Sequence, residues 1–310
     1  MTLESSLLLI IQWLVVIISA PLSLGILQWC KARVQGRTVK IFQPYLDLYK
    51  LHNKTASKGM GYLPLSIIGP IFMLSIWLVL CFMLPSAVFI HEPSFYIADL
   101  LLIIFIIGLS HFVQSLIGMN VESPLGEMGS SRAMYLHTIM EPTLIIIMIG
   151  FSIESSKTDL HQIITGLQPM QLNHNMLLLS LWLVILAEAG RLPFDNPATH
   201  LELTMSEKAI ELEFGGRQLA VLKLIEALRL TFLLLLMGAF ITPRLLADIS
   251  SGLSLRIFLL IALIPIKLIL GCVILGLWEI TRAKLRIRSL INPGIVALGL
   301  AITGILIGLI

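Results

Sequence analysis

Eight apolar stretches, each long enough or nearly long enough to cross a membrane, constrain the fold of this sequence more than any other feature. They lie at residues 5–29, 62–84, 98–118, 133–153, 174–189, 218–240, 254–278 and 293–310. A helix that crosses the hydrocarbon core of a bilayer needs about 20 apolar residues. Because backbone polar groups find no water there, each stretch must form its own hydrogen bonds as a helix. The pattern predicts an all-α polytopic membrane protein with about eight transmembrane helices.

Composition supports this fold class and excludes the main soluble classes. The chain has 310 residues, of which 57% are hydrophobic and 13% charged, whereas soluble domains carry about 25% charged residues. We therefore treat residues 1–310 as a single integral membrane domain that contacts the lipid bilayer, and we exclude a soluble enzyme or a nucleic-acid-binding protein. The three cysteines, Cys30, Cys81 and Cys272, lie far apart and form no CxxC pair. The sequence therefore predicts no structural zinc or iron–sulfur cluster in this chain.

The loop lysines and arginines predict the orientation of the chain in the membrane. Fifteen of them lie in the loops 31–61, 119–132, 190–217 and 279–292, and three lie in the loops between them. Loops rich in Lys and Arg stay on the cytoplasmic side. We therefore expect these four loops to be cytoplasmic and both termini to face the outer, periplasmic side of a bacterial or archaeal cell membrane.

The first cytoplasmic loop contains a predicted amphipathic helix. Ile41, Tyr45 and Leu48 share one helical face with Phe42 and Tyr49. A proline at residue 44 suits the first turn of such a helix. Short helices of this kind lie in the membrane interface. This one either contributes to a surface that docks a partner or anchors the loop to anionic lipids.

The loop 190–217 is predicted to dock another protein. It contains five acidic and three basic residues, and it is longer than a simple connection between two helices requires. A solvated loop without a partner is the alternative interpretation.

Six ionisable residues inside or at the ends of the predicted spans are the strongest sign of function. A charge near the bilayer centre costs at least about 2.5–3.5 kcal/mol, so each retained charge needs a partner, water or a function. Buried carboxylates beside cations can exchange protons, because burial raises their pKa and the cation lowers it. We therefore predict a proton relay. Its residues are Glu141, Glu188, Glu226, Lys223, Arg229 and Lys267. Static ion pairs between helices are the alternative, above all for the three residues spaced by three along 223–229.

Two histidines permit a different chemistry. His111 and His137 lie near the cytoplasmic ends of neighbouring predicted helices. Such a pair can ligate a haem, but two histidines in a bundle are a weak signal, and His137 could equally cap a polar helix end. We predict no metal site and no cofactor held by this chain alone.

The loop after the fifth apolar stretch carries a longer motif, AEAGRLPFDNPATHLEL, followed by ELEFGG. It resembles the E-x-x-R-x-P-F-D signature of the quinone-site H subunit of respiratory complex I and of its homologues in membrane-bound NiFe hydrogenases. The matching positions are Glu188, Arg191, Pro193, Phe194, Asp195, Glu202, Glu213 and Gly216. The stretches KARVQGR, SPLGEMGSSRAM, KLILG and WEITRAKLRI resemble the hydrogenase branch, of the formate hydrogenlyase subunit 4 and hydrogenase-4 component C type.

This resemblance implies a non-catalytic subunit of an oxidoreductase complex. It would hold peripheral iron–sulfur and NiFe-hydrogenase-like subunits, which carry the redox centres, and would lie beside antiporter-like membrane subunits. Electron transfer in the partners would be linked to the translocation of protons or sodium ions. The residues expected to dock the partners or couple to them are Arg33, Arg37, Asp47, Arg132, Arg191, Asp195, Glu202, Glu213 and Glu279. Within this set we expect Arg191 and Asp195 to pair.

Two other functions are compatible with the sequence. A quinone reductase subunit would enclose a quinone between the first span, the amphipathic helix and the loop 190–217. Departures from the family pattern at 38–40, Ala198 and His200 fall where a quinone or a partner would bind, and they favour the hydrogenase-type anchor. An independent secondary transporter would use the buried charges for its substrate. Transporters often contain internal repeats, and this sequence shows none.

Overall fold

The computed structural model describes residues 3–55, 64–84, 99–120, 123–167, 171–195, 205–241, 253–285 and 287–309. The helices are α1 (Leu3–Val34), α2 (Gln43–His52), α3 (Pro64–Met83), α4 (Leu100–Asn120), α5 (Pro124–Ser155), α6 (Leu160–Gly166), α7 (Leu172–Glu188), α8 (Glu207–Glu211), α9 (Gly216–Ile241), α10 (Leu253–Thr281) and α11 (Ile291–Leu309), with a 3-10 turn, η2, at Ile287–Leu290. These ranges contain no β-strand longer than a single bridge. The all-α fold predicted from the sequence is confirmed.

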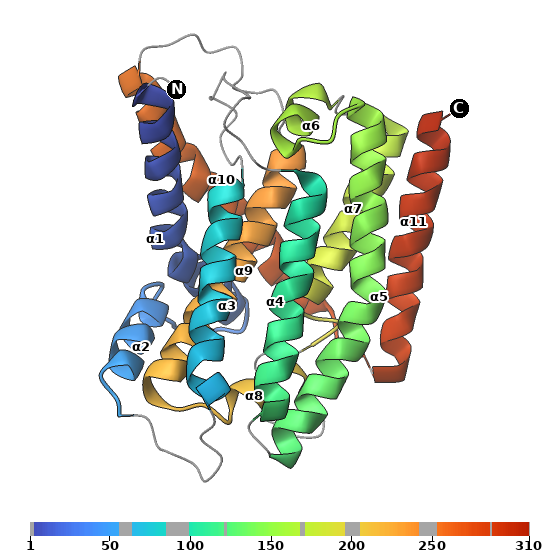
Figure 1. The fold of residues 1–310 in the computed structure, drawn as a ribbon. Helices are drawn as coiled ribbons and strands as arrows, with labels where there is room; N and C mark the ends of the chain where they lie inside the picture. Colours follow the sequence, from blue (N-terminus) through green and yellow to red (C-terminus); the bar gives the residue numbers. More distant parts are fainter. Residues whose placement is uncertain are drawn as a thin grey trace.

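Seven of these helices are long and apolar enough to cross a membrane: α1, α3, α4, α5, α9, α10 and α11. The helix α7 is also apolar and has 17 residues. Together they account for all eight predicted apolar stretches. Figure 1 shows them running between two ends of one bundle, with both chain termini at the same end. The chain is a multi-pass membrane protein, and we call the other end, near α2 and α8, the charged end.

The helix α9 forms the centre of the bundle. In its most apolar window 78% of the residues are buried, compared with 22% in α11, so α9 faces other helices and α11 largely faces outward. Two aromatic contacts fix α9 to its neighbours. Phe232 meets Trp77 of α3 edge-on at a centroid distance of 5.9 Å, and Phe240 stacks on Phe151 of α5 at 4.3 Å. Residues on this central helix are therefore held rigidly relative to α3 and α5.

The helix α11 packs against α5 and α7 through small residues. Its buried face consists of Gly294, Ala297, Ala301 and Gly304. Small residues let helix backbones approach closely in a membrane, where no hydrophobic effect drives helices together. The backbone carbonyl of Ala297 comes close enough to accept a hydrogen bond of 2.6 Å from the Ser180 hydroxyl of α7.

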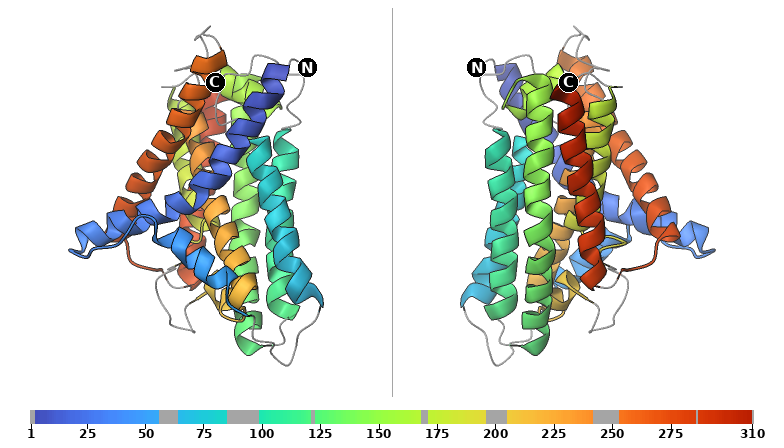
Figure 2. Two further views of the ribbon diagram at one scale, coloured as in Figure 1. Left: turned by 90° about the vertical axis from the view of Figure 1, so that its left-hand side faces the viewer. Right: turned by 90° about the vertical axis from the view of Figure 1, so that its right-hand side faces the viewer.

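The helix α1 bends outward, and α2 packs against the bend. Pro21 lies inside α1, where proline removes a backbone hydrogen bond and kinks a helix. Figure 2 shows that the second half of α1 slants away from the bundle and that α2 lies below it. The Tyr45 hydroxyl donates a 2.5 Å hydrogen bond to the carbonyl of Ile18. At Gly25, an added Cβ would lie 1.9 Å from the carbonyl oxygen of Ile41, so this contact requires glycine.

The predicted amphipathic helix is confirmed as α2, with a proline in its first turn. One detail of the prediction is wrong. Ile41, Tyr45 and Leu48 are partly buried, but Phe42 and Tyr49 do not share that packed face, because they are 66% and 71% exposed. The helix thus has one apolar side against α1 and α9 and two aromatic rings that project outward, which suits the interface of a membrane.

Replacing Gly25 with Ala tests the contact between α1 and α2. We expect the Gly25→Ala variant to lose about 1–3 kcal/mol of stability, because the new methyl group overlaps the Ile41 carbonyl and must displace α2. The measurement is the thermal unfolding midpoint in detergent, together with the rate of trypsin cleavage after Lys50. Gly299→Ala is the matched control, since no atom lies within 4 Å of its added Cβ. Equal behaviour of the two variants would contradict this packing.

Candidate functional site

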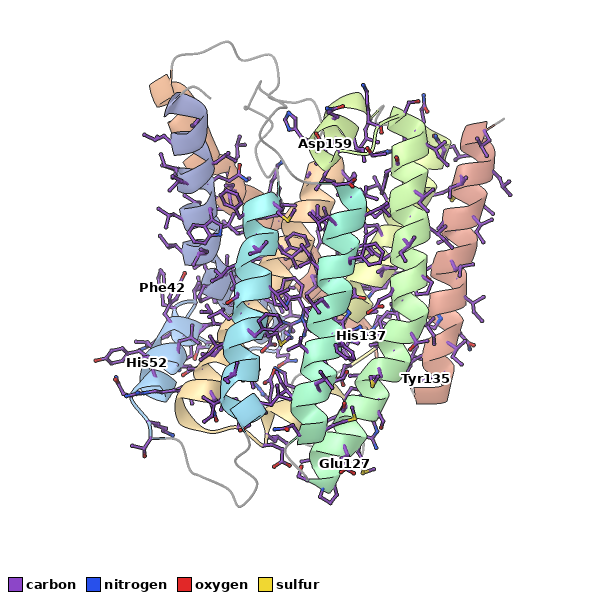
Figure 3. All side chains as sticks on the ribbon, in the orientation of Figure 1. Phe42, His52, Glu127, Tyr135, His137 and Asp159 are labelled. Atoms are coloured by element: carbon purple, nitrogen blue, oxygen red, sulfur yellow. The ribbon has the colours of Figure 1, made fainter. Side chains whose placement is uncertain are left out.

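Buried charged side chains from several helices meet in one layer nearer the charged end. In Figure 3, His137 lies within the bundle on that side, whereas Asp159 lies at the opposite end. The layer includes the last residue of α7, Glu188, and Arg191 of the segment that follows it. Its other members come from α1, α4, α5, α8, α9 and α10. Because α9 passes through the middle of the bundle, its residues link the two halves of the layer.

The first half begins at Glu141 of α5 and runs inward through a histidine. The Oε1 of Glu141 lies 2.9 Å from Nδ1 of His111 on α4, in a hydrogen bond. The other ring nitrogen of His111, Nε2, lies 2.8 Å from Glu188. Glu141 has a side chain that is 35% exposed, whereas Glu188 is 1% exposed. The imidazole of His111 therefore joins a half-exposed carboxylate to a fully buried one.

A second histidine continues this row toward α8. His137 lies 3.7 Å from Glu188 through Nδ1 and 3.6 Å from Glu207 through Nε2. Its ring stacks on the ring of His111 with a centroid distance of 3.6 Å and an interplanar angle of 13°. Glu207 in turn forms a bidentate ion pair with Arg229 of α9. The result is an alternating row of carboxylates and imidazoles that ends on a buried guanidinium.

The second half of the layer surrounds Glu226 of α9. This carboxylate lies 2.7 Å from Lys208 of α8, 3.3 Å from Lys223 and 3.5 Å from Arg191. Both lysines also contact Glu211, and Arg191 also lies 3.8 Å from Glu279 of α10. Glu279 itself pairs with Lys31 of α1. We call the residues of both halves together the charge network. Its members are Glu141, His111, Glu188, His137, Glu207, Arg229, Glu226, Lys208, Lys223, Glu211, Arg191, Glu279 and Lys31.

Two groups of α8 show how strongly the charge network shifts ionisation. Burial alone would raise the pKa of Glu207, but Arg229 and His137 outweigh it and hold that pKa at about 2, below its ordinary 4.5. Burial would likewise lower the pKa of Lys208, but Glu226 and Glu211 raise it above its ordinary 10.5. Both groups are therefore charged at neutral pH.

The histidine cluster does not have the geometry of a metal or haem site. Ligand atoms of His111, His137 and Glu141 lie within 4.8 Å of one another. The lone pairs of imidazole lie in the ring plane, so two rings stacked face to face cannot direct them at one ion at normal bond lengths. A haem would have to lie between its two histidine ligands, and the 3.6 Å stack has no room for it. The stacked arrangement of the two rings therefore does not fit the haem alternative raised from the sequence.

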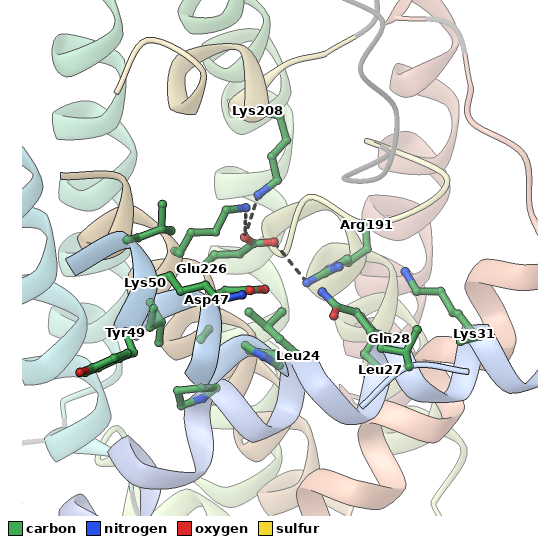
Figure 4. Close-up of a pocket in the computed structure, with 18 of the residues that line it drawn as sticks. Leu24, Leu27, Gln28, Lys31, Asp47, Tyr49, Lys50, Arg191, Lys208 and Glu226 are labelled. Atoms are coloured by element: carbon green, nitrogen blue, oxygen red, sulfur yellow. Dashed lines mark hydrogen bonds and ion pairs between the residues drawn. The ribbon is translucent and has the colours of Figure 1, made fainter. Parts of the chain in front are cut away.

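A cavity of about 950 Å³ lies between the slanted half of α1 and the charge network. We call it the cavity below α1, after the orientation of Figure 1; Figure 4 shows its lining with α1 at the bottom of the view. Its walls come from α1, the segment after it, α2, α8, α9 and Arg191. Glu226, Lys208 and Lys223 of the charge network line the inner end. The walls are those that the quinone interpretation predicts for a quinone site.

Comparison with known proteins gives the family. A family model described as NADH dehydrogenase matches residues 6–309.

The chain belongs to this family.

Two relatives of this family member come from Escherichia coli (strain K12). Formate hydrogenlyase subunit 4 is 27% identical over 286 residues, which are 90% of each chain. Hydrogenase-4 component C is 27% identical over 220 residues, which cover 68% of this chain and 67% of the relative. The predicted resemblance to hydrogenase-type membrane subunits of the complex I family is thus confirmed.

A solved structure has the same fold as this NADH dehydrogenase family member. A chain of the membrane-bound sulfane sulfur reductase, an archaeal respiratory membrane complex, superposes with a TM-score of 0.77. The match covers 96% of this chain and 99% of that chain at 19% sequence identity. The arrangement of helices is therefore that of a membrane chain found in a respiratory complex.

In this family member, five of the six residues predicted for the relay belong to the charge network: Glu141, Glu188, Glu226, Lys223 and Arg229. Two details differ from the prediction. Arg229 pairs with Glu207 of α8 and not with the stripe on its own helix. Lys267 lies apart on α10, against Gly238 of α9, and has no ion-pair partner among the residues that the structure describes.

Arg191 and Asp195 do not pair with each other as predicted. Arg191 contacts Glu226 and Glu279, whereas Asp195 accepts a 2.6 Å hydrogen bond from Lys284. Both residues and Glu279 are buried, with exposures of 3–4%. A docked protein therefore cannot touch these three side chains directly and could act on them only through their neighbours.

The remaining residues predicted for docking have varied surroundings. Arg33, Arg37 and Asp47 are exposed. Arg132 donates to the carbonyl of Met205, and Glu213 accepts a 2.7 Å hydrogen bond from Ser123, the N-cap of α5. Glu202 lies outside the described residues. The first group is available to a partner, and the second holds the segment around α8 against α5.

Sequence reasoning assigned no role in the site to six members of the charge network: His111, His137, Glu207, Lys208, Glu211 and Lys31. The histidines could have been found, because both lie in apolar helices where a polar ring needs a partner. Glu207 and Lys208 lie on a five-residue helix outside the apolar stretches. Charged residues are common in loops, so the sequence does not indicate that this segment is buried. The fold shows that it is.

Replacing Glu207 with Gln tests the ion pair that joins α8 to α9. The fold holds the pKa of Glu207 at about 2, below its ordinary 4.5, so the ionised carboxylate stabilises the fold by a few kcal/mol at pH values above about 4.5. We expect Glu207→Gln to unfold at a lower temperature at pH 7. The difference from the wild type should shrink as the pH falls from about 4.5 toward 2, because the wild-type carboxylate then becomes protonated.

The measurement is the thermal unfolding midpoint in detergent between pH 7 and pH 3. Glu127→Gln serves as the control, since Glu127 is exposed in the first turn of α5. A loss of stability in Glu207→Gln that is the same at every pH would contradict the assigned ion pair.

Proposed function

We propose that this chain is the membrane-anchor and coupling subunit of a complex-I-like membrane-bound hydrogenase or related oxidoreductase. It docks a peripheral redox module at the charged end and links electron transfer there to the translocation of protons, or of sodium ions, through the membrane part. The observation that carries the proposal is the row Glu141–His111–Glu188–His137–Glu207, which is partly exposed at Glu141 and buried from His111 onward. The named relatives, a formate hydrogenlyase subunit and a hydrogenase component, support the type of complex.

The charge balance of the network supports a mobile proton. Its six carboxylates are Glu141, Glu188, Glu207, Glu211, Glu226 and Glu279, and its five permanent cations are Lys31, Arg191, Lys208, Lys223 and Arg229. One proton on the two stacked imidazoles therefore makes the network neutral. A second proton would place two positive charges about as far apart as the stacked rings, at a Coulomb cost of about 4 kcal/mol for an effective dielectric constant of 20.

The contacts within the row are close but not all aligned for proton transfer. Both oxygens of Glu188, both nitrogens of His137 and Nε2 of His111 lack a hydrogen bond of normal angle, although countercharges lie within 2.8–3.7 Å. Proton transfer needs an aligned contact or one bridging water. A small rotation of either ring, or the entry of a water molecule, would connect the row. This geometry supports a relay whose contacts become aligned or misaligned when the surrounding electrostatic field changes.

The docking surface proposed is the charged end of the bundle. Exposed Arg33, Arg37 and Asp47 lie there, and the segments around α2 and α8 reach from that surface to the charge network. By the distribution of loop lysines and arginines this end faces the cytoplasm of a bacterial or archaeal cell, and both termini face outward. Peripheral iron–sulfur and NiFe-hydrogenase-like subunits would dock at this end, and antiporter-like subunits would lie beside the chain in the membrane.

Glu141→Gln in the assembled complex tests the relay. We expect assembly to be retained and ion pumping to be abolished, because the amide cannot accept and release a proton at this end of the row. The measurement is electron-transfer activity together with the ion gradient formed in proteoliposomes. Glu226→Gln should have the same effect if the second half of the charge network takes part in coupling.

Glu154→Gln is the matched control for Glu141→Gln. Glu154 lies on the same helix and also contacts a histidine, His174, at 3.2 Å, but near the opposite end of α5 and outside the charge network. We expect it to pump normally. Wild-type pumping by both Glu141→Gln and Glu226→Gln would reject the relay. Loss of pumping in Glu154→Gln as well would also count against it, because the loss would then be a general effect of altered Glu–His pairs.

A second candidate function, binding of quinone in a complex-I-like quinone reductase, is favoured by the cavity below α1. It predicts that a soluble quinone analogue such as decyl-ubiquinone inhibits or supports turnover of the complex. Leu27→Trp would fill the cavity from the α1 wall and should raise the KM for the analogue at least tenfold, an effect of about 1.4 kcal/mol. Turnover that is insensitive to quinone analogues and to Leu27→Trp would exclude this function.

A further inference from the structure

The cavity below α1 carries more positive charge than its carboxylates balance. Its lining contains seven lysine and arginine side chains but two carboxylates, Asp47 and Glu226. The cations that pair with carboxylates of the charge network are Lys31, Arg191, Lys208 and Lys223. The cations without an ion-pair partner among the described residues are Arg37, Lys50 and Lys54. Positive charge is therefore in surplus at the outer end of the cavity, where these three residues are exposed.

Part of the cavity lining is apolar. Pro21, Leu24 and Leu27 of α1 form it, and Leu48 and Leu51 of α2 extend it. Figure 4 shows Leu24 and Leu27 on the slanted half of α1, with Glu226 and Arg191 facing the same space. A ligand that fits both parts of the lining needs an apolar chain and an anionic head. Tyr49, which lines the cavity, and Phe42, the N-cap of α2, are both exposed; exposed amphipathic rings of the tyrosine kind gather at the depth of lipid headgroups.

We propose that this cavity binds an anionic phospholipid, with its phosphate against Arg37, Lys50 and Lys54 and an acyl chain along the α1 wall. Charge-assisted hydrogen bonds to phosphate are the contacts that lysine and arginine form best. The headgroup of a quinone is neutral and would leave all three cations unmatched. The volume of about 950 Å³ is in the upper part of the range for ligand pockets, so it holds the headgroup and part of a chain.

The test is a binding titration of the full-length protein, with whatever subunits copurify, in a neutral maltoside detergent. The probe is short-chain dihexanoyl-phosphatidylglycerol, and native mass spectrometry counts the bound molecules. We expect saturation at one lipid per chain. The triple variant Arg37→Gln, Lys50→Gln, Lys54→Gln should weaken binding at least tenfold, because each basic residue near an anionic lipid surface contributes about 1 kcal/mol.

The control removes the same amount of charge elsewhere at the charged end. Arg33→Gln, Lys40→Gln and Arg282→Gln together alter three cations that do not line the cavity, and this variant should bind like the wild type. Dihexanoyl-phosphatidylcholine, whose headgroup has no net charge, should bind at least tenfold more weakly than the phosphatidylglycerol. A tenfold change in affinity corresponds to about 1.4 kcal/mol.

Three outcomes would overturn the proposal. Equal binding of the two lipids would show that the anionic head is not recognised, and equal binding by the two triple variants would place the lipid elsewhere. Inorganic phosphate that binds as tightly as the lipid would assign the site to a free anion. These outcomes are independent of ion pumping, so the relay and the lipid site can fail separately.

Discussion

Compensation of charge inside a membrane protein is the constraint on which the rest of this structure depends. A lysine, arginine or glutamate that faces hydrocarbon alone costs several kcal/mol, and partners within the bundle remove most of that cost. The charge network supplies such partners from seven helices at once. The positions of α8 and of the segment that carries Arg191 follow from this requirement, because each brings an opposite charge to a residue on α9.

The apolar framework serves this arrangement. Phe232 and Phe240 hold α9 against α3 and α5, so that Glu226 and Arg229 stay in register with α8. Gly25 allows α2 to approach α1 at backbone distance, and α2 then forms one wall of the cavity. The rigid centre fixes the positions of the charges, and the separately attached α2 contributes lining residues to the cavity beside them.

Much of the fold could be predicted from the sequence, but less of the site could. Apolar length alone locates the seven long apolar helices and the shorter α7, and the pattern around residues 41–50 locates α2. The partners of the buried charges could not be predicted in the same way. Glu207 and Lys208 lie on a helix that is too short to leave a periodic pattern. Arg191 pairs with Glu226 and Glu279, and not with the nearby Asp195, because the loop folds inward. Such choices depend on contacts between residues far apart in the sequence.

The sharing of two lysines by Glu211 and Glu226 has a consequence for how this protein can diverge. A change that removes one member of this quartet alters the net charge of a mostly buried cluster, so it is tolerated best when an opposite charge is lost at the same time. Across homologues these four positions should therefore vary together, as paired gains and losses. In a lineage that has lost ion translocation, we expect apolar residues at all four positions, and not homologues in which one charged residue has been replaced alone.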